Sequence, residues 1–315
     1  MRTPTPDSDD GRRIGLLWAL TLLPWTWFLV RNVGVGLDPI AVVLPALAFF
    51  AAAALALAAI LLRRWAPAVV ALSFVVFAVF AVGAPRLPER SAPPAGAISL
   101  ASANTYRRNA QPGAASAALV ATGADVLVAV ETTSRVQSAL AARDTDHPYV
   151  ASTAQLMLRS RFPIQQETLP RDLPSTSVMR VRVDAPGEPI VVYVVHAPNP
   201  LFDTSFGNEL QLVQSLQRSA SVEGLPVVIA GDLNLSDRTI AYRVLDGSFL
   251  DAMRTGGWAS DTFDRGIWKL FFLRIDHVFV SRSWCAADPS RFDVPGSDHS
   301  GISVSLGACP PASSA

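Results

Sequence analysis

Acidic, amide and imidazole side chains recur at the ends of Val- and Ile-rich runs throughout the second part of this sequence. They are Asn104, Glu131, His196, Asp232, Asn234, Asp276, Asp298 and His299. The ends of strands are where a rigid scaffold presents reactive groups. Carboxylate and amide oxygens are the ligands that Mg²⁺ prefers, and imidazole is the commonest proton-transfer group. The set therefore offers oxygen ligands for a divalent cation together with groups that could move a proton.

Residues 98–308 alternate short β-like runs with helical patterns. The expected strands are Ala97–Ala103, Asp125–Val130, Ser177–Val183, Pro189–Val195, Pro226–Ala230, Ile275–Ser281 and Ile302–Leu306. The expected helices are Gly113–Thr122, Thr132–Ala142, Phe206–Ala220 and Ser236–Leu245, the last with Ser236 as its cap. Continuous apolar runs such as VVYVV and PVVIA indicate strands covered on both faces. The pattern predicts a layered α/β sandwich, although periodicity alone does not give its topology.

Three short motifs carry a resemblance to a known family: GDLN at residues 231–234, RIDHVFVS at residues 274–281 with Thr262 upstream, and SDH at residues 297–299. Together with the earlier Asn, Glu and His, and in this order, they resemble the endonuclease/exonuclease/phosphatase superfamily, which has the DNase I-like fold. The resemblance covers residues 98–308. It implies a four-layered α/β/β/α sandwich with a hydrolytic site at one edge of the sheets.

The resemblance also implies a metal site and a phosphoesterase activity. Glu131 would be the principal ligand of Mg²⁺, with Mn²⁺ as a substitute, and Asn104 and Asp298 would help to hold the ion or its waters. A bound divalent cation acts as a Lewis acid on a phosphoryl oxygen. Phosphate ester hydrolysis needs such charge stabilisation together with a water held in line with the leaving oxygen.

The remaining site residues take their expected roles from the same resemblance. Asp232 would orient or deprotonate the attacking water, and Asn234, two residues later, would donate to a phosphoryl oxygen. His299 would contact the phosphoryl group, while Asp276 fixes its tautomer and favours its charged form. His196 would be a second phosphate contact and a general acid for the leaving group.

Several of these residues also have ordinary structural explanations. Asn104 could cap a turn, and Glu131 could be an acidic residue at the start of a helix. Asn109 could reach substrate or be a loop amide. His277 is expected to face away from Asp276 along the strand, and His147 precedes a proline; both are interpreted as structural.

Two further groups of residues remain open from sequence alone. Trp268, Phe271 and Phe272 lie close to the site motifs and could be core residues or a rim that touches lipid. Cys285 and Cys309 are the only cysteines, and they could pair if their Cα atoms lie close enough.

Three apolar stretches precede the catalytic domain, at about residues 14–30, 39–62 and 67–82. Each has roughly the 17–25 residues that a membrane-spanning helix needs, whereas a signal peptide or a buried helical hairpin would be the alternative. Arginines cluster before the first stretch and between the second and third, which predicts a cytoplasmic N-terminus and an extracytoplasmic catalytic domain. Residues 85–97 form a Pro-rich linker, and residues 309–315 form a tail.

The charge and the anchor together favour one substrate class over another. Residues 98–315 carry 18 Arg and Lys against 21 Asp and Glu, a formal charge of −3, and no basic stripe. A nucleic-acid substrate is therefore less expected than a lipid. Three spans followed by a catalytic domain resemble the bacterial membrane-bound members, including the VanJ-type teicoplanin-resistance proteins of the cell envelope. That resemblance implies a lipid-linked pyrophosphate or a phospholipid as substrate. A surface nuclease and a non-catalytic protein that binds a phosphorylated lipid or a partner are the alternatives.

Overall fold

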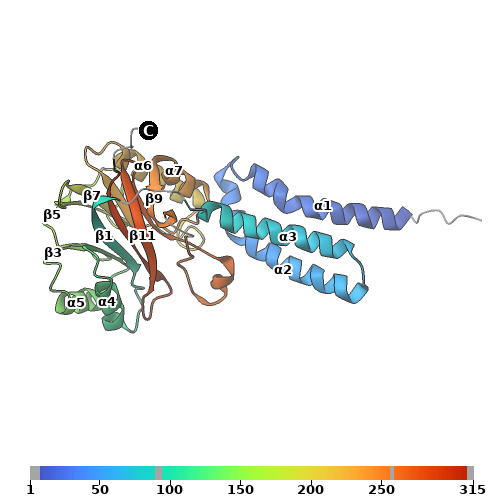
Figure 1. Cartoon of the computed structure of the whole chain (residues 1–315), viewed down its shortest axis with the longest axis horizontal. Helices are drawn as coiled ribbons and strands as arrows, with labels where there is room; N and C mark the ends of the chain where they lie inside the picture. The colour runs from blue at the N-terminus through green and yellow to red at the C-terminus, as the bar shows by residue number, and fades with distance from the viewer. Residues whose placement is uncertain (1–7, 89–93, 256–258, 311–315) are drawn as a thin grey trace, which may run out of the picture. The chain divides into compact units, whose positions relative to one another are not determined.

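The computed structural model describes residues 8–88, 94–255 and 259–310. The chain divides into two compact units, Met1–Pro85 and Arg86–Ala315 (Figure 1). The first is helical and the second contains all the strands. We describe each unit by itself.

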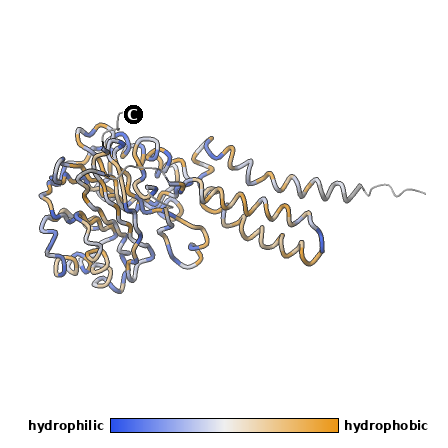
Figure 2. The backbone as a smooth tube through the Cα atoms, viewed as in Figure 1, coloured by the Kyte–Doolittle hydropathy of each residue, from blue (hydrophilic) through white to orange (hydrophobic). Residues whose placement is uncertain are grey.

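The first unit contains the helices α1 (Ser8–Val30), α2 (Asp38–Leu62) and α3 (Ala66–Gly83) and the short 3₁₀ turn η1 (Val35–Leu37). A second 3₁₀ turn, η2 (Ala84–Arg86), spans the boundary between the two units. Figure 2 shows α2 and α3 as almost continuously hydrophobic, in contrast to the mixed colouring of the second unit. Phe77 of α3 is fully buried and packs edge-on against Trp25 and Trp27 of α1, at ring distances of 5.6 and 6.0 Å. Aromatic contacts therefore hold α1 against α3.

Two stretches are long and apolar enough to cross a membrane, Val35–Leu62 and Ala66–Arg86. They correspond to the second and third predicted spans. The apolar part of α1 that the structure describes, Trp18–Val30, is shorter, and the side chains of Ile14 and Leu17 lie outside the described part. The first predicted span therefore stays a prediction.

The second unit contains two six-stranded sheets. The first has the order β11-β12-β1-β2-β4-β3 and the second has the order β5-β6-β7-β8-β10-β9. The strands of the first sheet are β1 (Ala95–Asn104), β2 (Val126–Val130), β3 (Tyr149–Ser152), β4 (Leu156–Ser160), β11 (Trp284–Asp293) and β12 (Ser300–Ala308). Those of the second are β5 (Ile164–Glu167), β6 (Val178–Val183), β7 (Ile190–His196), β8 (Val227–Asp232), β9 (Phe249–Asp251) and β10 (Asp276–Ser281).

Three apolar cores stack these elements into four layers. The central core joins the two sheets and includes Val128 and Ile302 from the first and Val192 and Val278 from the second. The outer face of the first sheet packs on α4 (Pro112–Ala121) and α5 (Ser134–Arg143). The outer face of the second packs on α6 (Phe206–Ser221) and α7 (Ile240–Ser248). The predicted α/β/β/α sandwich is confirmed, and its strands are buried on both faces as their composition requires.

All seven predicted strands and all four predicted helices are present, with small shifts of their ends. The helix predicted from Ser236 instead begins at Ile240, because the Thr239 hydroxyl accepts from the Tyr242 amide and caps it. Strands β3, β4, β5, β9 and β11 were not predicted. All of them except β4 are edge strands. Strand β11 shifts its register between Ala287 and Ser290 and contains Pro289, and such irregular edges lack the alternation on which a sequence prediction depends.

Cys285 on β11 and Cys309 after β12 form a disulfide, with their Cα atoms 4.8 Å apart. The question that the sequence left open is therefore answered by the pairing of β11 with β12, which brings Cys285 opposite Gly307. The bond closes the outer edge of the first sheet.

The second unit begins with a buried ion-pair network. Arg86 is only 2% exposed, and its Nε donates to Asp237 at 2.9 Å. Arg274 donates to Asp237 at 3.3 Å and to Asp251 at 2.7 Å, and Asp251 also accepts from the Tyr242 hydroxyl. Burial disfavours the charged carboxylate of Asp237, but the surrounding guanidinium groups outweigh it and lower its pKa to about 2. Arg86, three residues after the end of α3, is thus part of the folded domain.

Candidate active site

The candidate site lies where four strands end. Asn104 ends β1, Glu131 follows β2, His196 ends β7 and Asp232 ends β8. Because β1 runs parallel to β2 and β7 runs parallel to β8, the carboxyl ends within each pair lie at the same edge of their sheet. Contacts across the sandwich then join the two pairs, and the predicted residues meet at one place.

Asn104 connects the two sheets at this place. Its side-chain Nδ2 donates to Glu131 Oε1 at 3.2 Å and to Asp232 Oδ2 at 2.9 Å, and it is fully buried. Its Oδ1 accepts from the Tyr106 amide at 2.9 Å, which orients the amide group. Asn104 is therefore the bridge between the acidic residue of the first sheet and that of the second.

Glu131 is held as a carboxylate. Burial opposes its charge, but His196 Nε2 at 3.4 Å, the Arg107 amide at 2.9 Å and Asn104 together lower its pKa to about 2. Its backbone adopts the left-handed conformation, with φ of 52°. A non-glycine residue in that region costs free energy and persists where surrounding contacts determine it.

His196 is half-buried, and its Nε2 lies 3.4 Å from Glu131 Oε1, the oxygen that also accepts from Asn104. Burial disfavours its charged form, but Glu131 and Asp232 outweigh this and raise the pKa of His196. The imidazole is therefore biased towards its protonated form, as expected of a phosphate contact or a proton donor.

His299 lies between two carboxylates of neighbouring strands. Its Nδ1 is 2.8 Å from Asp276 Oδ2, and its Nε2 is 3.7 Å from Asp232 Oδ2. Burial opposes its charge, but the two carboxylates raise the pKa of His299 to about 10. For Asp232, burial and the charge of Asp276 raise the pKa to about 6 although His299 and His196 oppose them. A cationic imidazole and a carboxylate of raised basicity therefore stand side by side.

Asn234 lies two residues beyond the end of β8. Its backbone is left-handed, with φ of 52°, and its amide nitrogen donates to Asp232 Oδ1 at 2.9 Å. Its side-chain Nδ2 donates to the Ala197 carbonyl at 2.7 Å, and its Oδ1 accepts from Asn199 at 3.2 Å. One of its two side-chain N–H bonds is thereby engaged, and Asn199 is a neighbour that sequence reasoning did not identify.

Asp298 is placed differently from the other predicted metal ligands. Its carboxylate pairs with Arg265 at 3.1 Å, and its carbonyl accepts from the Asp264 amide at 2.8 Å. Within the described ranges, the two groups of closely spaced ligand atoms do not include it. The predicted role of Asp298 in holding a cation stays a prediction.

Close neighbours leave no room for a side chain at Gly231, in the GDLN motif, or at Gly296, just before the SDH motif. A Cβ at Gly231 would lie 2.0 Å from the Val195 carbonyl oxygen, because β8 approaches β7 closely just before Asp232. A Cβ at Gly296 would lie 2.1 Å from Asn109 Oδ1. Asn109 is buried, and its Nδ2 donates to the carbonyls of Thr105 and Pro295. It therefore has the structural role of joining two loops beside the site.

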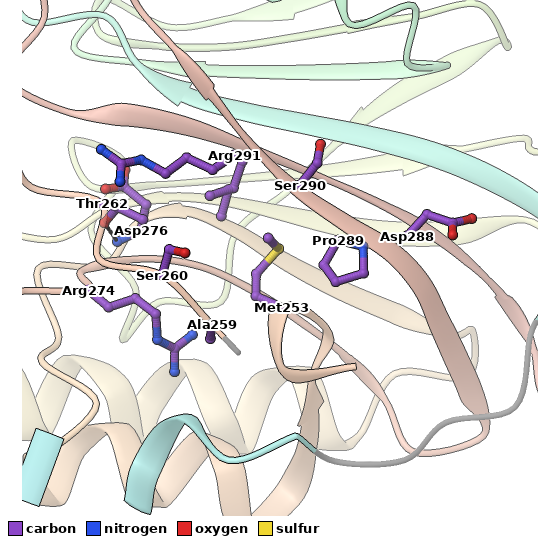
Figure 3. A pocket seen from close by; sticks show the side chains of 11 residues that line it. Met253, Ala259, Ser260, Thr262, Arg274, Asp276, Asp288, Pro289, Ser290 and Arg291 are labelled. Atoms are coloured by element: carbon purple, nitrogen blue, oxygen red, sulfur yellow. Dashed lines mark hydrogen bonds between the residues drawn. The ribbon is translucent and has the colours of Figure 1, made fainter. Parts of the chain in front are cut away.

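Thr262 holds the backbone at Asp276 in place. Its hydroxyl accepts from the amides of Ile275 and Asp276, both at 3.1 Å, and its carbonyl accepts from Ser300. A pocket of about 300 Å³ opens on this side of Asp276 and is drawn in Figure 3. Arg274, Ser260 and Arg291 are among the polar side chains that line it.

The other two histidines take no part in the site. His277 is fully buried, and its Nε2 lies 2.8 Å from the Leu235 carbonyl. Burial lowers its pKa to about 4, so it is neutral. His147 lies between Asp144 and the Ala124 carbonyl. Both therefore have the structural role expected for them.

The residues present fit a divalent cation. Ligand atoms of Glu131, His196 and Asp232 lie within 4.8 Å of one another, and so do those of Asp232, Asp276 and His299. Glu131 is a strongly acidic carboxylate at the more open end of this cluster, which suits a hard cation. The protonated histidine of the second group, His299, suits phosphate better than metal.

Comparison with solved structures shows the same fold. An endonuclease/exonuclease/phosphatase from Beutenbergia cavernae is 17% identical, with a TM-score of 0.53 over 69% of this chain and 73% of that chain. Sphingomyelinase C from Streptomyces griseocarneus is 14% identical, with a TM-score of 0.51 over 66% and 99% of the two chains. Truncated TDP2 from Caenorhabditis elegans is 16% identical, with a TM-score of 0.54 over 67% and 98%.

No curated protein matches the sequence. The model of the Endonuclease/Exonuclease/phosphatase family, by contrast, matches residues 101–299. That range begins within β1 and ends at His299, and it contains every residue predicted for the site. The order of catalytic groups along the chain, the two-sheet fold and this match agree, and the chain belongs to the endonuclease/exonuclease/phosphatase family of metal-dependent phosphoesterases.

Proposed function

We propose that this protein is a membrane-anchored, Mg²⁺-dependent phosphoesterase whose catalytic domain acts outside the cytoplasm on a phosphorylated lipid, either a lipid-linked pyrophosphate or a phospholipid. The proposed phosphoesterase activity rests on one cluster of side chains. In this cluster Asn104 joins Glu131 to Asp232, and His299 lies between Asp232 and Asp276.

The chain's own residues have separable tasks in this reaction. Asp232, whose pKa is raised, orients the attacking water towards phosphorus and accepts a proton from it. The charged His299 stabilises the phosphoryl oxygens, and Asp276 holds its ring in place through Nδ1. His196 donates a proton to the leaving oxygen. A cation held by Glu131, with Asn104 and Asp298 assisting, would supply Lewis-acid stabilisation of the phosphoryl charge.

The compartment and the anchor have separate support. Two apolar stretches of membrane-spanning length precede the domain. The Cys285–Cys309 disulfide suits an oxidising compartment such as the cell exterior, because cytosolic thiols are kept reduced. Arg63 and Arg64, between α2 and α3, favour a cytoplasmic turn, which directs the end of α3 outward.

The test is release of inorganic phosphate from undecaprenyl pyrophosphate by the full chain in detergent with Mg²⁺. We expect release that is lost with chelator and in Asp232→Asn. If the folded protein releases no phosphate but cleaves a phospholipid or bis(p-nitrophenyl) phosphate, its substrate is a phosphodiester and not a lipid-linked pyrophosphate. Nicking of plasmid DNA would favour the surface nuclease, and no hydrolysis of any phosphoester would favour a lipid-binding protein without catalysis.

A further inference from the structure

Large apolar side chains are exposed beside the candidate active site. We call the apolar rim the exposed Leu201, Phe202, Ile267 and Leu270 together with the half-buried Trp268, from the loop after β7 and from η4 (Gly266–Phe271). Phe202 is 71% exposed and Ile267 is 67% exposed. Phe202 meets Trp268 edge-on at 5.8 Å, and Trp268 meets Phe271 at 5.0 Å. A contiguous exposed patch of this kind marks an interaction surface more often than a core.

The segment that carries each half of the apolar rim contacts residues predicted for the site. On the β7 side, the Leu201 amide donates to Asn199 Oδ1, and Asn199 Nδ2 donates to Asn234. On the η4 side, Arg265 pairs with Asp298, and the Phe263 ring lies 5.0 Å from that of His299. The contact between Phe202 and Trp268 therefore joins the two segments that flank the site.

The η4 half is also bonded to the start of the catalytic unit. Arg86, the last residue of the apolar stretch Ala66–Arg86, donates from Nη2 to the carbonyl of Phe272. Arg238 donates to the Phe271 carbonyl at 3.0 Å. Segment 259–272, orange in Figure 1, projects from the body of the domain and carries the rim residues of η4. Arg86, the residue with which the second unit begins, is thus bonded directly to the segment that carries the rim residues of η4.

Basic side chains stand next to these apolar ones. Lys269, the only lysine of the chain, lies within η4 with 58% of its side chain exposed, and Arg265 precedes η4 with 57% exposed. Their acidic partners, Asp264 and Asp298, lie beneath them with smaller exposed fractions. Apolar side chains with adjacent Lys and Arg are the composition of a surface that lies in the headgroup layer of an anionic membrane.

We propose that the apolar rim rests in the interfacial layer of the bilayer that holds the chain, so that the catalytic cluster meets phosphate groups at headgroup depth. The proposal rests on the membrane-anchored function above and extends it to the way in which the substrate is reached. A rim in the interface lets a lipid keep its hydrocarbon in the membrane while its phosphate enters the site. The substrate class that follows is a phosphate close to its lipid chain.

The test uses the full chain in nanodiscs of phosphatidylcholine and phosphatidylglycerol, with one environment-sensitive fluorophore on an introduced cysteine. The two native cysteines form a disulfide, so Phe202→Cys or Ile267→Cys adds a unique thiol at an exposed position. Val222→Cys is the matched control, because Val222 is an 83% exposed apolar residue before β8, at the end of that strand opposite to Asp232.

We expect labels at Phe202 and Ile267 to shift to shorter emission wavelength, to be quenched by lipids with a doxyl group near the glycerol, and to be protected from iodide. The label at Val222 should show the opposite pattern. Rim labels that match the Val222 label would overturn the proposal, whether the rim faces water, a second copy or a nucleic acid. The readout needs no turnover, so its failure is distinguishable from failure of the proposed activity, which the phosphate-release assay measures.

Discussion

Asp276 lies directly opposite Asp232 in the antiparallel register of β10 and β8, and His299 lies between their two carboxylates. Like charges on paired residues repel one another, and the cationic imidazole between them offsets this repulsion. The three side chains therefore form one electrostatic unit, on which the effects predicted for Asp232 and His299 depend.

Asp232→Asn should remove the proton acceptor and lower kcat by about 10³-fold without unfolding the domain. The amide keeps the shape of the carboxylate, and the lost charge is one that burial disfavours. Steady-state hydrolysis of bis(p-nitrophenyl) phosphate and a thermal unfolding curve measure the two effects. Asp184→Asn, at an exposed ion pair with Arg182, is the control and should leave both unchanged. Retained turnover in Asp232→Asn would remove Asp232 from the mechanism.

The dependence of kcat/KM on pH should be bell-shaped. Asp232 must be ionised to accept a proton, so activity rises as pH passes its pKa of about 6, or lower when a bound cation favours the carboxylate. His196 must be protonated to act as the acid and His299 must be charged, so activity falls at alkaline pH when the first of these two imidazoles loses its proton; the pKa of His196 is raised, and that of His299 is raised to about 10. In His299→Gln the loss of positive charge should move the acid limb to higher pH. An acid limb that does not move would show that Asp232 and His299 are not coupled.

Asp237→Asn should destabilise the catalytic unit by about 3–5 kcal/mol, because it leaves the buried cations Arg86 and Arg274 without their shared carboxylate. The pKa of Asp237 is lowered to about 2, so its contribution is present above the ordinary carboxyl pKa and is lost as pH falls towards 2. Denaturant unfolding at several pH values tests this. A difference between wild type and variant that persists unchanged below pH 2 would contradict it.

Gly231→Ala should destabilise the domain by at least about 2 kcal/mol and lower activity as well. The new methyl group would overlap the Val195 carbonyl, and φ of 138° is one that alanine rarely adopts. Relief of the overlap must displace Asp232 from His196, which is paired with it across β7 and β8. Gly187→Ala, at a turn with open space around it and φ of 88°, is the control for conformational strain alone. It should lower stability but not kcat.

Replacement of Cys285 and Cys309 by serine should lower stability by about 3 kcal/mol, as expected for a disulfide that closes a loop with a sequence separation of 24. Thiol labelling of protein isolated from cells should modify no cysteine until the protein is denatured and reduced. Ready labelling of both cysteines in freshly isolated protein would show a reducing environment and would contradict the extracytoplasmic position.

The two-sheet fold, and the meeting of most of the predicted residues at one place, could be predicted because strand ends and residue types are local features of the sequence. Asn104, Glu131, His196, Asp232, Asp276 and His299 all follow or begin apolar runs, and the parallel pairing of those runs brings them together. Asn199 could not be found in this way, because it stands in an irregular loop and its contact with Asn234 depends on that loop's path. The same is true of Arg86, whose partner Asp237 lies 151 residues away.

The burial of Arg86 has a consequence for how the protein could be processed. Cleavage within the Pro-rich segment after Arg86 would separate this cation from Asp237, and the released fragment would lack part of the network beneath η4. To release an intact enzyme, a protease would have to cut before Arg86, within or beside the apolar stretch Ala66–Arg86. Shedding at the Pro-rich segment would therefore yield a destabilised fragment instead of a secreted enzyme.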